Sequence, residues 1–242
     1  MSYTPQLLIN NKNDFPNESA LSTKVNNEWQ TLTWSDYYDF VIKISKSLVA
    51  CGLKPGDRVT LHMPMIPELP ITMLACARLG VIHSQVFGGF SGTACGDRII
   101  DSESNVLITA DSYNRNGKLL DHKIKADEAV HQANSNGTNV EKVLIWQRYP
   151  DKYSSSSPMI EGRDYSVNSL LESYKGKTTE PESMPADSPL FLMYTSGTTA
   201  KPKGIQHSTG GYLSYAAATS KICSNMKYSD SLFISLEAKF SC

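Results

Sequence analysis

Residues 58–110 alternate between two kinds of apolar segment: RVTLHMPMIPELPITMLACARLGVIHSQVFGGFSGTACGDRIIDSESNVLITA. Short apolar runs at 58–63, 81–87 and 105–110 are typical of buried strands, and the segments 67–80 and 91–104 between them are predicted to be helices. Strands that alternate with helices indicate βαβ units and a mostly parallel sheet covered on both faces. The predicted fold class is therefore α/β, a mostly parallel sheet flanked by helices.

The same alternation continues after this stretch. A helix is predicted at 120–133, and strands are predicted at 140–146 and 189–196. The intervening residues, about 147–188, contain a serine run and several prolines, which favour a long loop with one short helix at 167–174. Because the fifth strand resembles the first four in composition, this loop is interpreted as an excursion within one domain.

Before residue 58, the sequence predicts a hairpin followed by a helix. The pair Asn26-Asn27 tolerates the positive φ of a tight turn, which favours a small N-terminal hairpin. Helical spacing then begins after a cap at Thr33 or Ser35, and Gly52 supplies the stop. The residues with this spacing are Tyr37, Val41, Ile44 and Leu48.

Composition limits the partners. The 242 residues include 23 Lys and Arg against 24 Asp and Glu, and the formal net charge is −1. No overall field favours nucleic acid or an anionic membrane, and no apolar run approaches the ~20 residues of a membrane span. The five cysteines form no CxxC pair, which favours a reducing compartment. We expect a soluble cytoplasmic protein without nucleic-acid or membrane partners.

A loop rich in glycine and hydroxyl groups follows the last predicted strand, MYTSGTTAKPKG at 193–204. Gly197 and Gly204 allow backbone N–H groups to turn toward an anion, and Lys201 and Lys203 add positive charge. Hydroxyl donors come from Thr195, Ser196, Thr198 and Thr199. Since open α/β sheets bind ligands at the carboxyl ends of their strands, this loop is a candidate polyphosphate site.

Two common nucleotide motifs do not fit. The Walker P-loop requires a glycine five residues after Gly197, where this chain has Pro202. The spacing of Gly88, Gly89, Gly92 and Gly96 never matches the dinucleotide fingerprint GxGxxG. Composition alone leaves an ordinary solvated loop as the alternative.

The ordered string YTSGTTAKPKG resembles the phosphate-loop signature of the adenylate-forming superfamily. Three further stretches are similar to its short-chain branch, the AMP-forming acetyl-CoA and propionyl-CoA synthetases: ACARLGVIHSQVFGGFS at 75–91, DRIIDSESNVLITAD at 97–111 and GIQHSTGGYL at 204–213. The resemblance extends from about residue 18 to about residue 231. It implies the first half of the large N-terminal domain of these enzymes.

The family's reaction joins a short-chain carboxylate, acetate or propionate, to ATP with Mg²⁺ and releases pyrophosphate. The acyl-adenylate then transfers its acyl group to coenzyme A. Negative charge develops on the departing phosphates, which explains a loop of preorganised donors. By resemblance, Lys203 is the mobile cation that closes over these phosphates. Residues implied to bind the β and γ phosphates are Thr195, Ser196, Gly197, Thr198 and Thr199.

The resemblance implies a second site in TADSYNRNGK at 109–118. Arg115 and Lys118, which flank Asn116 and Gly117, match basic residues placed against the nucleotide end of coenzyme A in the acetyl-CoA synthetase branch. Arginine binds phosphate oxygens in a fork and lysine acts as a point charge. Without the family, a solvated turn is the better interpretation.

Several other reactive residues are predicted to be structural. His62, His83 and His207 lie in or beside apolar strands and are interpreted as packed imidazoles, with no metal-ligand spacing. Cys76 is predicted to lie on a buried helix face and to be inert. In GGFS, Ser91 is expected to cap a helix after a tight turn.

The chain departs from the family in two places. Ala200 stands where a glycine is usual, which costs about 1 kcal/mol if the position needs positive φ. The predicted division is an N-terminal extension at 1–16, an incomplete adenylation domain at 17–231 and a tail outside the family at 232–242. The small C-terminal domain, with the lysine that promotes adenylation, is absent from these residues, so no catalytic residue is assigned.

These departures lead us to expect a truncated chain that is inactive alone. Apolar surface that normally packs against the missing half would be exposed and would favour self-association. Two alternatives stay open: a noncatalytic fragment that binds nucleotide or coenzyme A, and a different adenylating acyl-CoA ligase.

Overall fold

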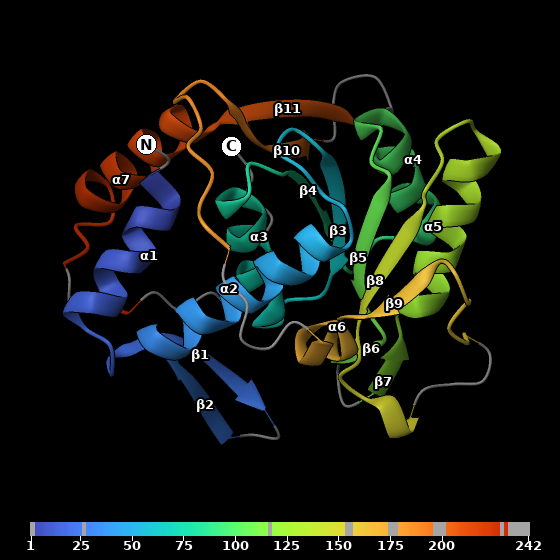
Figure 1. Ribbon diagram of the computed structural model, residues 1–242, viewed down its shortest axis with the longest axis horizontal. Helices are drawn as coiled ribbons and strands as arrows, with labels where there is room; N and C mark the ends of the chain where they lie inside the picture. Colours follow the sequence, from blue (N-terminus) through green and yellow to red (C-terminus); the bar gives the residue numbers. More distant parts are fainter. Residues whose placement is uncertain are drawn as a thin grey trace.

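The computed structural model describes residues 3–25, 28–115, 118–152, 157–173, 179–195, 202–227 and 230–231. Figure 1 shows the arrangement of the elements. In chain order they are α1 (Tyr3–Asp14), β1 (Ser19–Val25), β2 (Glu28–Thr33), α2 (Trp34–Ala50), β3 (Arg58–Met63), α3 (Glu68–Arg78), β4 (Ile82–Phe87), α4 (Gly92–Ser102), β5 (Val106–Ala110), β6 (Ser112–Arg115), β7 (Lys118–Asp121), α5 (Lys123–Ser135), β8 (Lys142–Trp146), the 3₁₀ turn η1 (Pro150–Lys152), β9 (Asp164–Ser166), α6 (Val167–Ser173), β10 (Pro189–Thr195), β11 (Lys203–Ser208) and α7 (Thr209–Ile222).

A seven-stranded sheet forms the centre of the described part of the chain, in the order β11-β10-β4-β3-β5-β8-β9. All neighbouring pairs from β10 to β9 are parallel, and only β11 pairs antiparallel, along β10. Because neighbouring strands twist relative to one another, β10 and β5 run in clearly different directions in Figure 1. The predicted α/β class with a mostly parallel sheet is confirmed.

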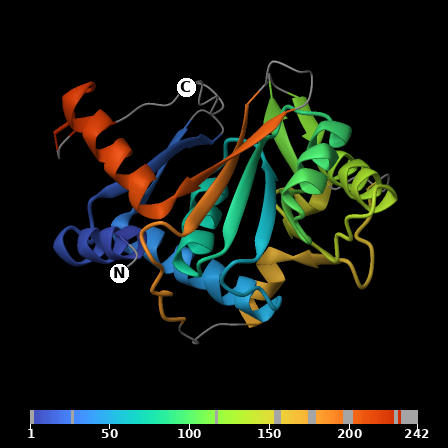
Figure 2. The ribbon, with the colours of Figure 1, turned by 90° about the horizontal axis from the view of Figure 1, so that it is seen from above.

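Each buried strand supplies both faces of the sheet, since successive side chains point in opposite directions. In β5, Val106 and Ile108 pack in a core cluster with residues of α2, α3 and α6, whereas Leu107 packs with residues of α4 and α5. In β8, Leu144 belongs to the first cluster and Val143 to the second. Figure 2 shows the sheet between these two groups of helices. None of the described helices has the length and apolar character that a membrane span needs.

The predicted helix starts are confirmed at two caps. Thr33 caps α2: its hydroxyl accepts from the Asp36 N–H at 3.1 Å, and the Asp36 carboxylate accepts from the Thr33 N–H at 3.1 Å. This reciprocal pair satisfies two N–H groups that a helix start otherwise leaves unbonded. Ser91 caps α4 by accepting from the Ala94 N–H at 3.1 Å.

Two glycines allow α4 and α5 to pack closely. A Cβ on Gly92 would lie 2.5 Å from the Lys125 carbonyl oxygen of α5, and one on Gly96 would lie 3.0 Å from the Ala129 carbonyl oxygen. Any larger side chain at Gly92 would therefore push the helices apart. This contact holds the helix pair that covers one face of the sheet.

All five predicted strands and the four predicted helices between residues 34 and 135 occur in the structure, with boundaries shifted by a few residues. The N-terminal hairpin is confirmed as β1–β2, and α6 occupies the predicted short helix at 167–174 up to residue 173. The sequence did not predict β9 inside the 147–188 loop, nor β6, β7, β11, α1 and α7. Helix α1 falls within the predicted N-terminal extension and packs against α2, α3 and α7, with Leu8 buried.

Candidate functional site

The carboxyl ends of the parallel strands bring the two predicted sites to one edge of the sheet. Strand β10 ends at Thr195, directly before the hydroxyl-rich loop, and β5 ends at Ala110, directly before the β6–β7 hairpin. Strands β4 and β3 lie between β10 and β5. With the twist of the sheet, the two sites are separate: the end of β10 lies near α4, whereas the hairpin lies at the bottom of Figure 1.

The hydroxyl-rich loop is described at its two ends. Thr195 closes β10 and Lys203 opens β11, and the two residues face each other in the antiparallel register. Thr195 is half-buried and Lys203 is exposed. The predicted phosphate-binding residues Ser196, Gly197, Thr198 and Thr199, together with Ala200, lie outside the described residues. The register therefore places one hydroxyl and one ammonium group at the ends of the loop.

The Tyr194 hydroxyl donates to Asp101 Oδ2 of α4 at 2.7 Å. The Arg98 guanidinium lies 5.6 Å from the centre of the Tyr194 ring. A cavity of about 390 Å³ borders this contact, with Pro202 among its lining residues. No local pattern in the sequence indicated a role for α4 at this site.

The predicted coenzyme A site falls on the β6–β7 hairpin. Arg115 and Lys118 form the last pair of its register, and both side chains are exposed. Asn116 and Gly117 lie outside the described residues. Asn114 Nδ2 donates to the Tyr149 hydroxyl at 2.9 Å, which joins the hairpin to the segment after β8. The hairpin thus presents a basic pair beside the end of a second strand.

Arg115 also lines a cavity of about 220 Å³ together with Lys24 of β1 and Arg148, two residues after β8. Three basic side chains from three distant segments therefore share one cavity, an arrangement suited to an anion. Lys24 and Arg148 were not predicted from the sequence as binding residues. The position of Arg148 just after a buried strand was a usable signal, whereas nothing in β1 distinguishes Lys24. Lys118 is not among the residues that line this cavity.

Asp111 fixes the segments that form this cavity. Its buried carboxylate accepts three backbone N–H groups, from Ser112 at 2.6 Å, Arg148 at 3.1 Å and Tyr149 at 2.8 Å. Its carbonyl oxygen accepts from the His122 N–H at 2.8 Å. One residue therefore joins the end of β5, the start of the hairpin, the start of α5 and the segment after β8. Backbone N–H groups also offset the cost of burying the carboxylate.

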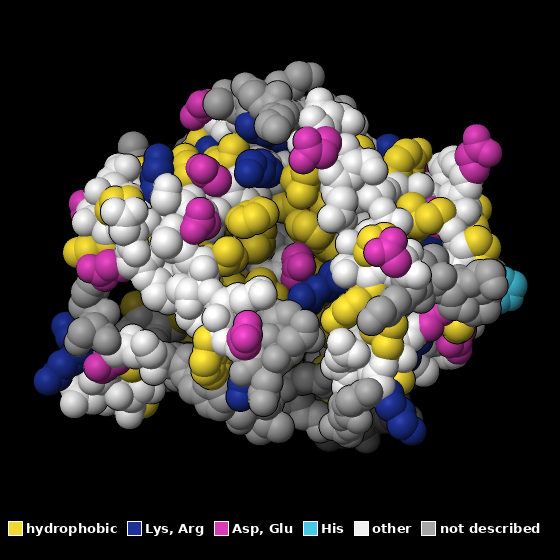
Figure 3. Space-filling model, turned by 90° about the horizontal axis from the view of Figure 1, so that it is seen from below, with side chains coloured by type: hydrophobic (Ala, Val, Ile, Leu, Met, Phe, Trp, Pro, Cys, Tyr) yellow, Lys and Arg dark blue, Asp and Glu magenta, His cyan; other side chains and the backbone are white. Residues whose placement is uncertain are grey.

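A larger hollow of about 410 Å³ adjoins the basic cavity, and Arg148 lines both. Phe40, Ile71 and Trp146 give it apolar walls, and Arg148 Nη1 lies 3.5 Å from Glu68 Oε2. Seen from below in Figure 3, the molecule has a central hollow lined by hydrophobic, acidic and basic side chains. An apolar wall beside charged groups suits a ligand with both characters.

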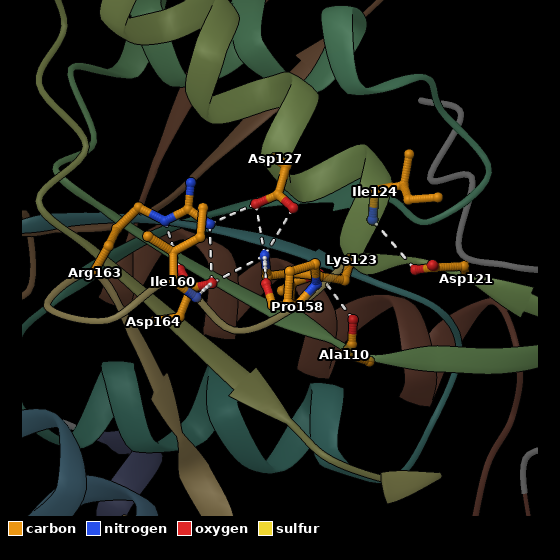
Figure 4. A network of polar contacts seen from close by, with 10 residues as sticks. Ala110, Asp121, Lys123, Ile124, Asp127, Pro158, Ile160, Arg163 and Asp164 are labelled. Carbon is orange, nitrogen blue, oxygen red and sulfur yellow. Dashed lines mark hydrogen bonds and ion pairs between the residues drawn. The ribbon is translucent and has the colours of Figure 1, made fainter. Parts of the chain in front are cut away.

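A buried ionic network joins the start of α5 to Arg163 and to Asp164 at the start of β9 (Figure 4). The fully buried Lys123 Nζ lies 2.6 Å from Asp127 Oδ1 and 2.9 Å from Asp164 Oδ2. Arg163 donates to both carboxylates. Burial alone would raise the pKa of Asp164, but hydrogen bonds from Arg163, the Ile160 N–H and Lys123 hold it below its ordinary value.

Two buried histidines lie under the β6–β7 hairpin. The rings of His62 and His122 are 4.5 Å apart, and His122 Nε2 lies 3.0 Å from the His62 carbonyl oxygen. Burial lowers the pKa of His122 to about 4, and burial, together with the repulsion that a second protonated ring would meet at His122, lowers the pKa of His62 well below its usual range. Both imidazoles are therefore neutral at pH 7. His62 is packed in the interior, as predicted, whereas no role was predicted for His122.

The other predicted structural residues also pack in the interior. His83 is buried, with its ring 5.6 Å from Phe191, and the partly buried His207 stacks on the same ring at 4.6 Å. Cys76 is fully buried, and burial raises the pKa of its thiol to about 12, so the thiol is unreactive at neutral pH. Among the described residues, no three His, Cys, Asp or Glu side chains gather as a metal site would require.

A family model described as AMP-binding enzyme matches residues 9–241. The chain therefore belongs to the AMP-binding enzyme family. This match includes the sheet, both candidate sites and the second half of α1.

Within this family, the chain is similar to acetyl-coenzyme A synthetases. The chain is 44% identical over 193 residues to an acetyl-coenzyme A synthetase of Shewanella frigidimarina, which covers 80% of this chain and 29% of that protein. It is 45% identical over 188 residues to an acetyl-coenzyme A synthetase of Rhizobium rhizogenes, covering 78% and 28%. The predicted resemblance to acetyl-CoA synthetases is confirmed.

The fold is also similar to that of a solved acyl-CoA synthetase structure. An acetoacetyl-CoA synthetase from Streptomyces lividans superposes with a TM-score of 0.78 at 26% identity, covering 92% of this chain and 33% of that one. The chain therefore spans about 28–29% of the length of the two sequence relatives and 33% of the solved structure.

Proposed function

We propose that this chain supplies the ATP-phosphate and coenzyme A contacts of an AMP-forming acetate–CoA or propionate–CoA ligase. The observation that carries the proposal is the register pair Thr195–Lys203, which places a hydroxyl and a cation at the two ends of a hydroxyl-rich loop at the carboxyl edge of a parallel sheet. The similarity to acetyl-CoA synthetases over 80% of this chain supports the same reaction class.

The chemistry assigned to the loop is electrostatic. When a carboxylate attacks the α-phosphorus of ATP, negative charge grows on the departing pyrophosphate. Thr195 donates a hydrogen bond from its hydroxyl to these phosphates, and Lys203 supplies an ammonium group. In the family's signature, the backbone N–H groups and hydroxyls of 196–199 donate further hydrogen bonds. Mg²⁺ arrives bound to the nucleotide, and the Thr195 hydroxyl is the kind of oxygen ligand that this ion accepts.

Coenzyme A is assigned to the hairpin. Its nucleotide end carries phosphates, and Arg115, Lys24 and Arg148 line the cavity beside the hairpin. Lys118 adds a fourth positive charge next to Arg115, on the hairpin outside that cavity. The cytoplasm, which holds both ATP and coenzyme A, is the compartment proposed for this reaction. Self-association stays a prediction; exposed apolar side chains on β11 and α7 favour it, among them Ile205, Tyr215 and Ile222.

Calorimetric titration of the chain with Mg-ATP tests the proposal. We expect saturable binding, and we expect Lys203→Ala to weaken it by about tenfold, because a charge-assisted contact to phosphate is lost. Lys221→Ala on α7 is the matched control, since it removes an exposed lysine outside the site. Absence of binding, or an equal loss in both variants, would exclude this role for the loop.

An activity measurement distinguishes a catalytically active ligase from a fragment that binds nucleotide without catalysis. Acetate-dependent exchange of pyrophosphate into ATP would show that these residues suffice for adenylation. Binding of Mg-ATP without exchange would instead support a fragment that binds nucleotide and does not catalyse.

A further inference from the structure

Tyr194 connects the end of β10 to helix α4. Its hydroxyl donates to Asp101 Oδ2 at 2.7 Å, although the two residues are separated by more than ninety positions along the chain. Burial, followed by the hydrogen bond to Asp101 and its negative charge, raises the pKa of Tyr194. The phenol therefore stays protonated at neutral pH and remains the donor.

Arg98 restrains the same tyrosine from one turn earlier in α4. Its guanidinium lies 5.6 Å from the Tyr194 ring centre and 4.6 Å from the Phe90 ring centre, and Nη1 donates to the Ala94 carbonyl oxygen at 2.5 Å. A guanidinium over an aromatic face is attracted by the ring's quadrupole. Because the arginine is itself held by Ala94, it favours one orientation of the tyrosine ring.

Gly204 leaves the space for this contact. It pairs with Tyr194 in the β10–β11 register. A Cβ on Gly204 would lie 3.1 Å from Tyr194 Cε1 and 3.2 Å from Asp101 Oδ2, closer than most real contacts. The next pair in the register is Thr195 with Lys203. Tyr194 and Gly204 are therefore each one residue away from an end of the loop, and Tyr194 donates the hydrogen bond to α4.

We propose that Tyr194 and Asp101 are positioning residues that hold Thr195 and Lys203 in the arrangement that binds the phosphates of ATP. This inference rests on the function proposed above. Asp101 acts through Tyr194, because a carboxylate in contact with the phosphates would repel them. The benefit is preorganisation: donors already fixed by packing lose little freedom when the nucleotide binds.

The test compares Tyr194→Phe and Asp101→Ala, each of which removes the hydrogen bond, with two controls. Tyr215→Phe removes the hydroxyl of an exposed tyrosine on α7, and Asp39→Ala removes an exposed carboxylate from α2, on the other face of the sheet from α4. Calorimetry with Mg-ATP should show about tenfold weaker binding for both test variants, since one hydrogen bond to a charged acceptor changes an equilibrium by about that factor. The double variant should be no weaker than either single one, because both remove the same bond.

Amide hydrogen exchange shows whether the effect is local. Peptides covering β10 and β11 should exchange faster in Tyr194→Phe, while β3 and β5 keep the protection of the unaltered chain. Faster exchange throughout the sheet would indicate a general structural role and would overturn the inference. Unchanged affinity in both variants would overturn it as well, while leaving the proposed function intact. If the unaltered chain binds no Mg-ATP, the proposed function fails, and the positioning role fails with it.

Discussion

Arg115 and Arg148 contribute to one cavity from the ends of two different strands, and Lys24 contributes from a third segment. An arginine side chain offers a fork of N–H donors to phosphate, so two of them in one cavity give both affinity and orientation. Lys118 pairs with Arg115 in the hairpin but does not line the cavity. At the scale of single residues, the basic groups are therefore not equivalent.

Replacing either arginine should weaken binding of coenzyme A. We expect Arg115→Ala and Arg148→Ala each to lower the affinity by about tenfold, measured by calorimetry, because each loses a charge-assisted contact. Arg58→Ala is the control, since Arg58 lies at the amino end of β3, at the opposite edge of the sheet. If Lys118→Ala weakened binding and Arg148→Ala did not, the ligand would bind on the outer face of the hairpin.

Only part of this arrangement could be predicted. Arg115 and Lys118 were predicted because their positions match two basic residues of the acetyl-CoA synthetase branch, and Lys203 because it lies in a stretch that resembles the family's phosphate loop. Arg148 and Lys24 become neighbours of Arg115 only when the sheet forms, since 33 residues separate Arg115 from Arg148 and 91 separate it from Lys24. Local sequence patterns contain no information on such distant contacts.

At the scale of elements, Asp111 holds four segments together through hydrogen bonds to backbone groups. Three backbone N–H groups, from Ser112, Arg148 and Tyr149, donate to its carboxylate. The positions of the hairpin and of the segment after β8 therefore depend on this one side chain. In Asp111→Asn the amide nitrogen replaces one acceptor oxygen and faces a donor. We expect a loss of about 2–4 kcal/mol in the free energy of unfolding, measured with urea, because buried donors lose their acceptor.

The exposed Asp39→Asn on α2 is the control for that measurement, and it should change the free energy of unfolding by less than about 0.5 kcal/mol. Binding of coenzyme A should also fall in Asp111→Asn, because the hairpin and Arg148 lose their common anchor. Equal stability of Asp111→Asn and Asp39→Asn would contradict the structural role given to this carboxylate.

The contact between α4 and α5 depends on the absence of a side chain at Gly92. Alanine normally favours a helix over glycine by up to ~1 kcal/mol, but here its Cβ would lie 2.5 Å from the Lys125 carbonyl oxygen. We expect the clash to prevail, so that Gly92→Ala lowers the free energy of unfolding by about 1–3 kcal/mol in urea. Ser135→Ala, at the exposed end of α5, is the control. A stabilised Gly92→Ala variant would mean that the helices separate at little cost.

At the scale of the whole molecule, the ionic network of Lys123 and Asp164 joins α5 to the last strand of the sheet. The pKa of Asp164 lies below its ordinary value of 3.8 in the folded chain. A lowered folded-state pKa contributes stability that is fully present above pH ~3.8 and is lost as the pH falls through the folded value. The sheet edge should therefore weaken under acid conditions.

Urea unfolding between pH 2.5 and pH 6 measures this effect. The unaltered chain should lose stability steeply below pH ~4, whereas Asp164→Asn should be less stable at pH 6 by about 3 kcal/mol and should depend less on pH in that interval. Asp187→Asn, on an exposed carboxylate, should keep the pH profile of the unaltered chain. Parallel profiles for Asp164→Asn and the unaltered chain would exclude Asp164 as a source of the acid sensitivity.

Residues 58–110 by themselves determined the α/β class. Strand and helix patterns repeat within a few residues, so each can be recognised inside its own segment without knowledge of the tertiary structure. Weakly patterned segments were not predicted: β11 is exposed over most of its length, and α1 and α7 show little amphipathic pattern. Only the tertiary structure decided that Tyr194 contacts α4, that Arg148 shares a cavity with Lys24, and that Lys203 faces Thr195. The physical reason is that these contacts depend on strand order, twist and register, which arise from the packing of the whole chain.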